Sequence, residues 1–389
     1  MDTSNIIYLD HASSSPRKRE VMDVREQFEL SQYANVWRGR YSLAESAETA
    51  YANSKKAVAE WIDCDPVEVL YTYSTTYALN LLALAIEHNG VVGKGDTILL
   101  SVSEHHANIV PWQMLAERVG AQVKFVGLDA QYRINLDDLK NKLNDSVKVV
   151  SFQYASNVTG AVHPVEKVRE IIGNERFFCV DAAQMAVHGP LSMKKIQCDA
   201  MVFSGHKMMA DTGIGVLALW KLLQKSWQAP IGGGGAINYV TLDGYQQSWI
   251  PERWEPGTPH ITGAVTLTAA IEYLENMPSQ KRDGYKNLIQ FVNEKFAVLQ
   301  GKGVRVFHSD TENALGVWSF SLEGKHVNDI ADAFAGENIC VRAGHHCCQP
   351  LHEYFWITGT VRLSIGFDTT EQELETFFSV LEKILAMKN

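Results

Sequence analysis

Short apolar runs alternate with amphipathic segments along the first half of the chain. The apolar runs predict strands at 68–73, 97–102, 123–126, 147–153, 177–180, 200–203 and 216–220. The intervening segments have helical spacing at 75–88, 109–119, 136–143 and 165–172. Nearly unbroken apolar strands that alternate with helices are typical of a mainly parallel sheet covered on both faces. The pattern therefore predicts a large α/β domain.

The rhythm differs at the two ends of the chain. A strand at 6–9 and helices at 20–31 and 44–62 come first. After the glycine run 232–235 and a proline-rich loop, we expect helices at 263–275, 281–299, 327–334 and 371–387, and strands at 304–307, 317–322 and 361–365. We therefore expect an N-terminal segment at 1–30 that packs with the small domain, a large domain at 31–261, and a small α+β domain at 262–389.

Composition narrows the class of protein. The 389 residues suffice for two domains, and a hydrophobic share of 46% is ordinary for a globular protein. A formal net charge of −10 argues against a nucleic-acid partner, because phosphate binding needs a basic face. No apolar run approaches the roughly 18 residues of a membrane span. The N-terminus lacks the pattern of a signal peptide, so we expect a cytoplasmic protein with six reduced cysteines.

A lysine stands at the end of one predicted strand. The run 200–203 stops at Ser204-Gly205, and His206-Lys207 follow directly. Burying an ammonium is costly unless it is paired or used chemically, for example to form a Schiff base with an aldehyde. A lysine that simply emerges into solvent is the alternative, and these residues alone leave both open.

Polar clusters follow four other predicted strands. Ligands of open parallel sheets bind beyond the carboxyl ends of the strands, so these clusters are expected to line one pocket. Singly, each reads equally well as a helix cap, a turn or a satisfied polar group. Together with Lys207 the candidates are Thr75, Thr76, His105, Asn157, Asp181, Gln184, Ser204 and His206.

This set of residues fits pyridoxal phosphate. The cofactor needs a lysine for its aldehyde, here Lys207, and an acid that keeps its pyridine nitrogen protonated, here Asp181. Gln184 and Asn157 are expected to bond the ring oxygen, and His105 to stack on the ring face. The phosphate would be held by hydroxyl and imidazole groups of Thr75, Thr76, Ser204 and His206.

The same stretches resemble a known family. Residues 104–112, 156–160, 180–184 and 204–207 resemble class V aminotransferases, and Arg342-Ala343-Gly344-His345-His346-Cys347 narrows the resemblance to cysteine desulfurases of the SufS-like (type II) branch. The resemblance covers nearly the whole chain. It implies the pyridoxal-phosphate fold type I, a homodimer, and conversion of L-cysteine to L-alanine with a persulfide left on the enzyme. It also implies a small sulfur-acceptor or scaffold protein of iron–sulfur assembly.

The resemblance also implies roles in the second half of the chain. Cys347 would be the nucleophile, Arg362 the clamp on the substrate carboxylate, and Thr258 a phosphate ligand that acts across the dimer. The chemistry of the residues agrees, because arginine binds carboxylates with a two-pronged fork and a thiolate needs positive neighbours such as Arg342.

In the reaction so implied, Lys207 removes the Cα proton and His105 moves protons on or off the product. Arg38 either lines the substrate entrance or is a solvated structural arginine.

Two cysteines and two departures from the family leave questions open. Four adjacent ligands at 345–348 cannot easily wrap one zinc ion, so no metal is expected. Cys348 either traps the persulfide as a disulfide or packs inward, and we favour packing.

Tyr77 stands where relatives carry glutamate, and Ala210-Asp211 where they carry Gly-Pro. An acid near Lys207 would alter the local field.

Other activities of the same class remain alternatives. A selenocysteine lyase, acting on L-selenocysteine, would use the same residues, whereas an aminotransferase or an epimerase needs no thiol at Cys347. A binding or scaffold subunit could keep the fold without activity. The intact set of Lys207, Asp181 and Arg362 argues against this last possibility.

Overall fold

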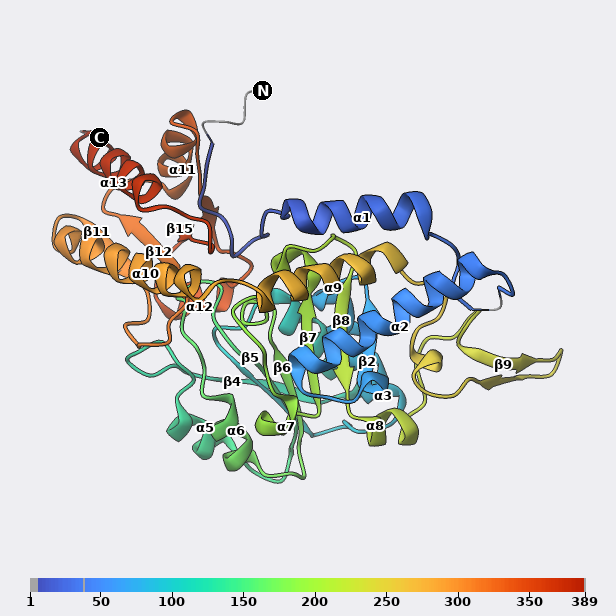
Figure 1. Cartoon of the computed structure of the whole chain (residues 1–389). Coiled ribbons are helices and arrows are strands. Elements are labelled where there is room, and N and C mark those ends of the chain that lie inside the picture. The colour runs from blue at the N-terminus through green and yellow to red at the C-terminus, as the bar shows by residue number, and fades with distance from the viewer. Residues whose placement is uncertain (1–5, 38, 388–389) are drawn as a thin grey trace.

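A seven-stranded sheet forms the centre of the larger part of the molecule. The computed structural model describes residues 6–37 and 39–387. The strand order is β2-β8-β7-β6-β5-β3-β4, and β8 alone runs against its neighbours (Figure 1). The strands are β2 (Val69–Thr72), β3 (Thr97–Ser101), β4 (Gln122–Val126), β5 (Val147–Gln153), β6 (Phe177–Asp181), β7 (Ala200–Ser204) and β8 (Gly215–Leu219). The expected mainly parallel sheet is therefore confirmed.

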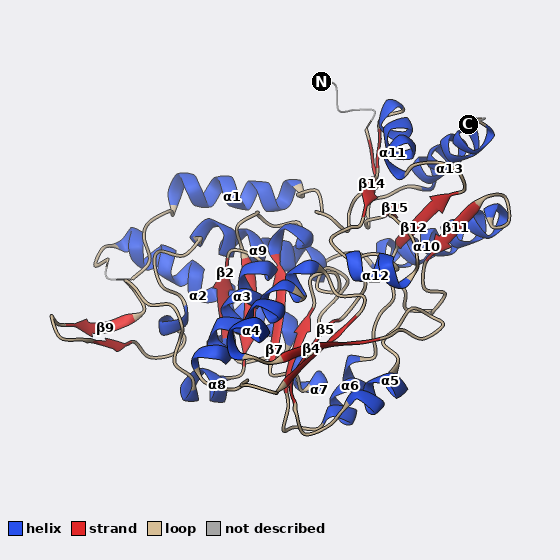
Figure 2. Ribbon diagram, turned by 180° about the vertical axis from the view of Figure 1, so that it is seen from behind, coloured by secondary structure: helices blue, strands red, loops and turns tan. Residues whose placement is uncertain are grey.

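Helices cover both faces of this sheet. Neighbouring residues of one strand contribute to opposite cores: Val69 and Tyr71 pack with α2 and α9, whereas Leu70 packs with α3 and α4. Helices cover the two faces in both views (Figures 1 and 2). They are α1 (Arg19–Ser31), α2 (Ser42–Ile62), α3 (Thr75–His88), α4 (Val110–Val119), α5 (Leu136–Lys142), α6 (Val165–Ile172), α7 (Met193–Ile196), α8 (Lys221–Ser226) and α9 (Ile261–Glu275).

A second, antiparallel sheet builds the smaller part. Its strands are β11 (Val304–Phe307), β12 (Val317–Leu322), β15 (Thr360–Ser364) and β14 (Arg342–Gly344), in that order. Its core is rich in aromatic side chains, and the rings of Phe334 and Phe377 stack at 4.7 Å. The helices of this part are α10 (Ser279–Leu299), α11 (Val327–Gly336), α12 (Gln349–Tyr354) and α13 (Glu371–Ala386).

The packing of α9 bears on the domain boundary. Ile261, Ala264 and Leu267 of this helix belong to the same core as α2 and the large sheet. The boundary expected at 262 would assign α9 to the small domain, where it makes no such core. We therefore propose that the small domain begins at α10.

The N-terminal segment contacts both parts of the molecule. Its strand β1 (Ile7–Tyr8) pairs in parallel with β13 (Ile339–Cys340), which follows α11. Helix α1 instead packs against α9. The segment at 1–30, expected to pack with the small domain, thus also contacts the large one in its described part.

Several short elements were not expected from the sequence. The hairpin of β9 (Ile237–Val240) and β10 (Tyr245–Gln247) projects from the large domain (Figure 1). Single 3₁₀ turns cover Pro66–Glu68, His106–Asn108, Gly205–Met208 and Glu252–Trp254. Elements this short carry too little hydrophobic periodicity to be recognised. Within the described ranges, no helix is long and apolar enough to cross a membrane.

Candidate active site

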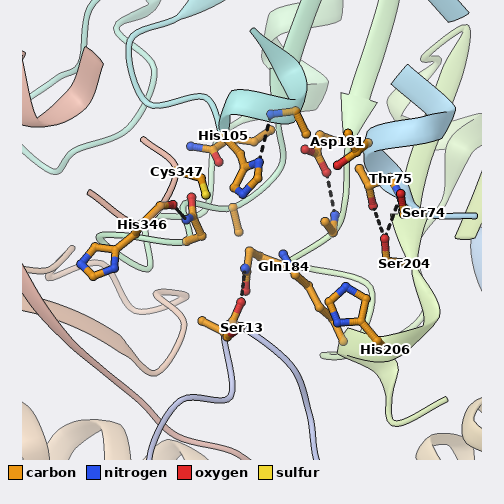
Figure 3. A pocket seen from close by; sticks show the side chains of 18 of the residues that line it. Ser13, Ser74, Thr75, His105, Asp181, Gln184, Ser204, His206, His346 and Cys347 are labelled. Carbon is orange, nitrogen blue, oxygen red and sulfur yellow. Dashed lines mark hydrogen bonds between the residues drawn. The ribbon is translucent and has the colours of Figure 1, made fainter. Parts of the chain in front are cut away.

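A cavity of about 270 Å³ lies at the carboxyl ends of the central strands, where the small domain meets them (Figure 3). Most of the predicted residues line it, and they come from segments that lie far apart in the sequence. These residues are Thr75, Thr76, His105, Asn157, Asp181, Gln184, Ser204, His206, Lys207, Arg342, Cys347 and Arg362. Their convergence follows from the topology, because the parallel strands end at one edge.

Two predicted residues are not part of this group. Thr258 is exposed and lines a different cavity of about 350 Å³, together with Tyr73, Tyr77 and Trp254. Arg38 lies outside the described residues. Sequence reasoning missed Ser13 and Gln153, which do line the first cavity. Gln153 offered a signal, because it is a polar residue at the end of an apolar strand.

Lys207 and Asp181 supply the charged centre of the cavity. Asp181 ends β6, and Lys207 lies in the turn that follows β7. Burial lowers the pKa of Lys207 to about 8, although the charge of Asp181 acts to raise it. Burial raises the pKa of Asp181, while the Ala183 N–H, 2.9 Å from its Oδ1, and Lys207 act in the opposite direction. The lysine therefore gives up its proton far more easily than an exposed lysine does.

Hydroxyl groups gather at the N-terminus of α3. Ser74 caps this helix by accepting a hydrogen bond from the Tyr77 N–H at 3.2 Å. Ser204 Oγ accepts from the Thr75 N–H at 2.8 Å and lies 2.7 Å from the Thr75 hydroxyl (Figure 3). Helix N-termini with hydroxyl side chains attract anions, because their backbone N–H groups point outward with a positive partial charge.

His105 presents an uncharged ring to the cavity. Its Nδ1 accepts a hydrogen bond from the Ala107 N–H at 3.0 Å, so the neutral ring carries its hydrogen on Nε2 (Figure 3). Burial, assisted by the charge of Lys207, lowers the pKa of His105 to about 3. At neutral pH the residue therefore offers a flat face and one N–H donor.

The cysteine loop adopts an unusual backbone conformation. His346 and Cys347 both have left-handed φ angles, 52° and 55°, which cost about 1–2 kcal/mol for each residue with a side chain. Contacts with the large domain hold them: the His106 N–H donates to Cys347 O at 2.7 Å, and Asn157 Nδ2 donates to His346 O at 2.8 Å. The side chain of Cys347 remains exposed at the cavity.

Cys348 points the other way. It is fully buried, as expected, and its thiol donates toward the carbonyl oxygens of Ser103 and Glu104, each at 3.1 Å. Burial raises the pKa of this thiol well above its usual value. Adjacent cysteines in this loop therefore occupy opposite environments, one exposed and one buried.

Arg362 lies on the floor of the cavity. Its guanidinium is buried, donates from NH1 to Asn157 O at 3.1 Å, and donates from NH2 to Asp10 Oδ1 at 2.8 Å. Burial lowers its pKa, and Asp10 acts in the opposite direction. Since β15 carries Arg362 in the interior of the small sheet, the cation has a rigid support.

The departures at Tyr77 and Asp211 lie outside this cavity. Tyr77 packs edge-on against Tyr73, with ring centroids 5.4 Å apart. Asp211 is buried and pairs with Arg17 at 3.2 Å and Arg25 at 3.4 Å. Asp211 does not line the cavity, and the expected effect of its charge on the field at Lys207 stays a prediction.

The four residues at 345–348 do not converge on one point. His346 Nε2 instead lies 2.8 Å from the Thr360 hydroxyl, and Cys348 is bonded to backbone oxygens. Among residues 6–37 and 39–387, no three histidine, cysteine or acidic side chains are grouped as metal ligands.

Comparison with known proteins agrees with this geometry. The family model described as aminotransferase class V matches residues 7–377. A probable cysteine desulfurase of Pyrococcus abyssi is 36% identical over 388 residues, covering 98% of this chain and 95% of that protein. A probable cysteine desulfurase of Synechocystis sp. is 35% identical, covering 97% and 90% respectively.

Solved structures extend the similarity to the whole fold. The apo cysteine desulfurase of Thermococcus onnurineus has a TM-score of 0.92 and 35% identity, covering 99% of this chain and 96% of that one. The cysteine desulfurase CsdA of Escherichia coli, in an S-sulfonic acid form, has a TM-score of 0.89 and 29% identity, with the same coverage. The expected fold class, the pyridoxal-phosphate fold type I, is thereby confirmed.

Proposed function

The chain belongs to the class V aminotransferase family, and on this premise we propose that it is a pyridoxal-phosphate-dependent cysteine desulfurase. The observation that carries the proposal is an exposed thiol, Cys347, at a cavity that also holds Lys207, Asp181 and a buried arginine. Relatives described as cysteine desulfurases support it over nearly the full length. The SufS-like (type II) branch stays a prediction.

The residues of the cavity suit the cofactor. Lys207 has a lowered pKa, as an amine that attacks an aldehyde needs. The hydroxyls of Thr75 and Ser204 at the N-terminus of α3 suit a phosphate, with Thr76 and His206 on the same wall. When bound, pyridoxal phosphate would supply an electron sink for charge that develops at the substrate Cα. Asp181 is the acid that would keep the pyridine nitrogen protonated, while Gln184 and Asn157 would face the ring oxygen.

Substrate binding would use the small-domain wall. Arg362 offers a carboxylate a two-pronged set of donors, and the exposed Arg342 adds a second positive charge at the same cavity. Little water reaches the part of the cavity that Arg362 and Asn157 line, because both residues are buried. The carboxylate of L-cysteine would thereby be oriented so that its thiol faces Cys347.

The chemical steps follow from the positions of three side chains. Lys207 takes the Cα proton, and its lowered pKa lets it act as a base near neutral pH. The Cys347 thiolate attacks the substrate sulfur: an S–S bond forms, the Cβ–S bond breaks, and its electron pair remains on Cβ. Cβ then takes up a proton to become the methyl group, and Lys207 returns a proton to Cα to complete alanine. His105, with its Nε2–H donor, would hold the departing product rather than carry a charge.

The assembly and the partners form a second layer of the proposal. Thr258 lies on an exposed loop away from its own chain's cavity, which supports the idea that it completes the site of a second copy in a homodimer. The exposure of Cys347 supports transfer of its sulfur to a small acceptor or scaffold protein of iron–sulfur assembly. A cytoplasmic location remains part of this proposal.

Selenocysteine lyase is the alternative activity, and it would use the same residues of this site. The exposed thiol favours either activity over transamination or epimerisation, which leave Cys347 unused. Turnover of L-cysteine and L-selenocysteine by the same preparation would rank the two substrates.

The decisive test pairs product analysis with intact mass. Purified holoenzyme is given L-cysteine, alanine is quantified, and sulfur added to the protein is located by peptide mapping. We expect stoichiometric alanine and one added sulfur on Cys347. Cys347→Ala should bind cofactor but form no persulfide. Bound cofactor without alanine or added sulfur would point to another class V reaction, and full sulfide release by Cys347→Ala would exclude this nucleophile.

A further inference from the structure

Residues 7–15, which we call the N-terminal strap, tie the small domain to the lysine turn. On one side, the Leu9 N–H donates to Cys340 O at 3.0 Å, and the Ser364 N–H donates to Leu9 O at 2.8 Å. On the other side, the Ser15 hydroxyl donates to Lys207 O at 2.7 Å. The strap therefore bridges the two walls of the cavity.

Asp10 is the charged residue at the centre of this strap. Its Oδ1 accepts from Arg362 NH2 at 2.8 Å, and its Oδ2 accepts from Arg342 NH2 at 2.8 Å and from Arg342 Nε at 3.1 Å. Its side chain is only 13% exposed, and that of Arg362 is 3% exposed. Ser13, next along the strap, also accepts a hydrogen bond from Arg342.

We propose that Asp10 is a positioning and specificity-determining residue that holds Arg362 and Arg342 for a monocarboxylate substrate. The inference rests on the proposed function, in which Arg362 binds the carboxylate of L-cysteine. Asp10 engages one edge of the Arg362 guanidinium and Asn157 O engages NH1, so the cation is fixed in orientation before the substrate arrives. Pre-orientation of this kind improves binding because less rotational freedom is lost.

Asp10 also sets the net charge of the group that it forms with Arg342 and Arg362. Two arginines and one aspartate leave a residual charge of one positive unit at this wall, which one carboxylate neutralises. Without the Asp10 charge, two positive units would face the ligand, and a dicarboxylate would gain the most. Asp10 therefore has two effects. It orients Arg362 for one carboxylate, and its charge weakens the binding of ligands that carry a second carboxylate.

The test uses holoenzyme variants and simple carboxylate inhibitors. We expect Asp10→Asn to raise the KM for L-cysteine by about tenfold, with a much smaller change in kcat, because the charge-assisted hydrogen bonds that orient the two arginines are weakened. In the same variant, malonate should become the stronger inhibitor relative to acetate, so the ratio of their inhibition constants (the inhibitor ratio) should change. Asp10→Glu restores the charge at a longer reach, so it should keep the preference for acetate even where KM rises.

Controls separate this inference from the function it builds on. Asp129→Asn removes a carboxylate that pairs with Arg133 at 2.9 Å, away from the cavity and the strap, and it should leave KM and the inhibitor ratio unchanged. Arg362→Gln should raise KM strongly; an unchanged KM there would overturn the proposed carboxylate site. A raised KM in Arg362→Gln with no change of KM or inhibitor ratio in Asp10→Asn would overturn the role of Asp10 alone.

Discussion

The two walls of the cavity are built in different ways. On the large-domain wall, Asp181 ends β6 and Lys207 follows β7, and these two strands are adjacent, parallel and buried. On the small-domain wall, Cys347 lies on a loop with two consecutive left-handed residues, and Arg342 lies on the edge strand β14. Asp181 and Lys207 are fixed by the large sheet itself, whereas Cys347 and Arg342 depend on contacts with segments far away in the sequence.

This difference separates two kinds of function. Under the proposed function, the sheet edge would hold the groups that serve the cofactor. The cysteine loop and the strap would hold the groups that meet the substrate and release sulfur, and they are joined to the large domain by individual hydrogen bonds such as that from His106 N–H to Cys347 O. Changes on the first wall should therefore abolish chemistry, and changes on the second should alter binding or transfer.

The largest effect is expected at Lys207. Under the proposed function, Lys207→Ala would remove both the amine that binds the cofactor aldehyde and the base for the Cα proton, so alanine formation should fall to background. Removal of a catalytic base alone typically costs about 10²–10⁴-fold. Borohydride reduction followed by mass spectrometry should detect covalently held cofactor in the native protein and none in the variant. Measurable alanine from the variant would show that another group takes the proton.

A graded effect is expected from the pair of Lys207 and Asp181. In cofactor-free protein, labelling of Lys207 by an amine reagent should rise with pH and reach half its maximum near the pKa of about 8, because only the neutral amine reacts. Asp181 raises the pKa of this lysine, so Asp181→Asn should shift the midpoint to lower pH.

Peptide mapping at a series of pH values measures this midpoint for Lys207 alone. Lys295, which is not part of the cavity, provides an internal reference in the same digest. A midpoint shifted to higher pH in Asp181→Asn would contradict the electrostatic coupling between Asp181 and Lys207.

The sequence predicted the first wall better than the second. Each residue at a strand end, such as Asp181, could be placed because parallel strands end at one edge. Cys347 and Arg362 were placed by resemblance, since no local periodicity locates them. Asp10 was missed: it follows a two-residue strand of a separate sheet, and its partners Arg342 and Arg362 lie more than 300 positions away. The ion pairs of Asp211 with Arg17 and Arg25 could not be predicted for a similar reason, because they are visible only in three dimensions.

The smallest effect is expected at Cys348, which anchors the second wall. Cys348→Ala removes the thiol contacts with Ser103 O and Glu104 O and leaves a small void, so the free energy of unfolding should fall by about 1–2 kcal/mol. Cys348→Ser keeps a donor and should lose less. Urea denaturation measures the free energy of unfolding of both variants. Cys340→Ala, which removes another thiol of the same domain, is the control.

Turnover measurements distinguish a structural role of Cys348 from a role in which it accepts sulfur from Cys347. Because the Cys348 thiol is buried and its pKa is raised, the persulfide should stay on Cys347, and sulfur release should continue in Cys348→Ala. Loss of sulfur release with Cys347 still persulfidated would instead mean that the second cysteine accepts the sulfur. In that case the cysteine loop would have to open before transfer, since the Cys348 thiol is buried whereas Cys347 is exposed.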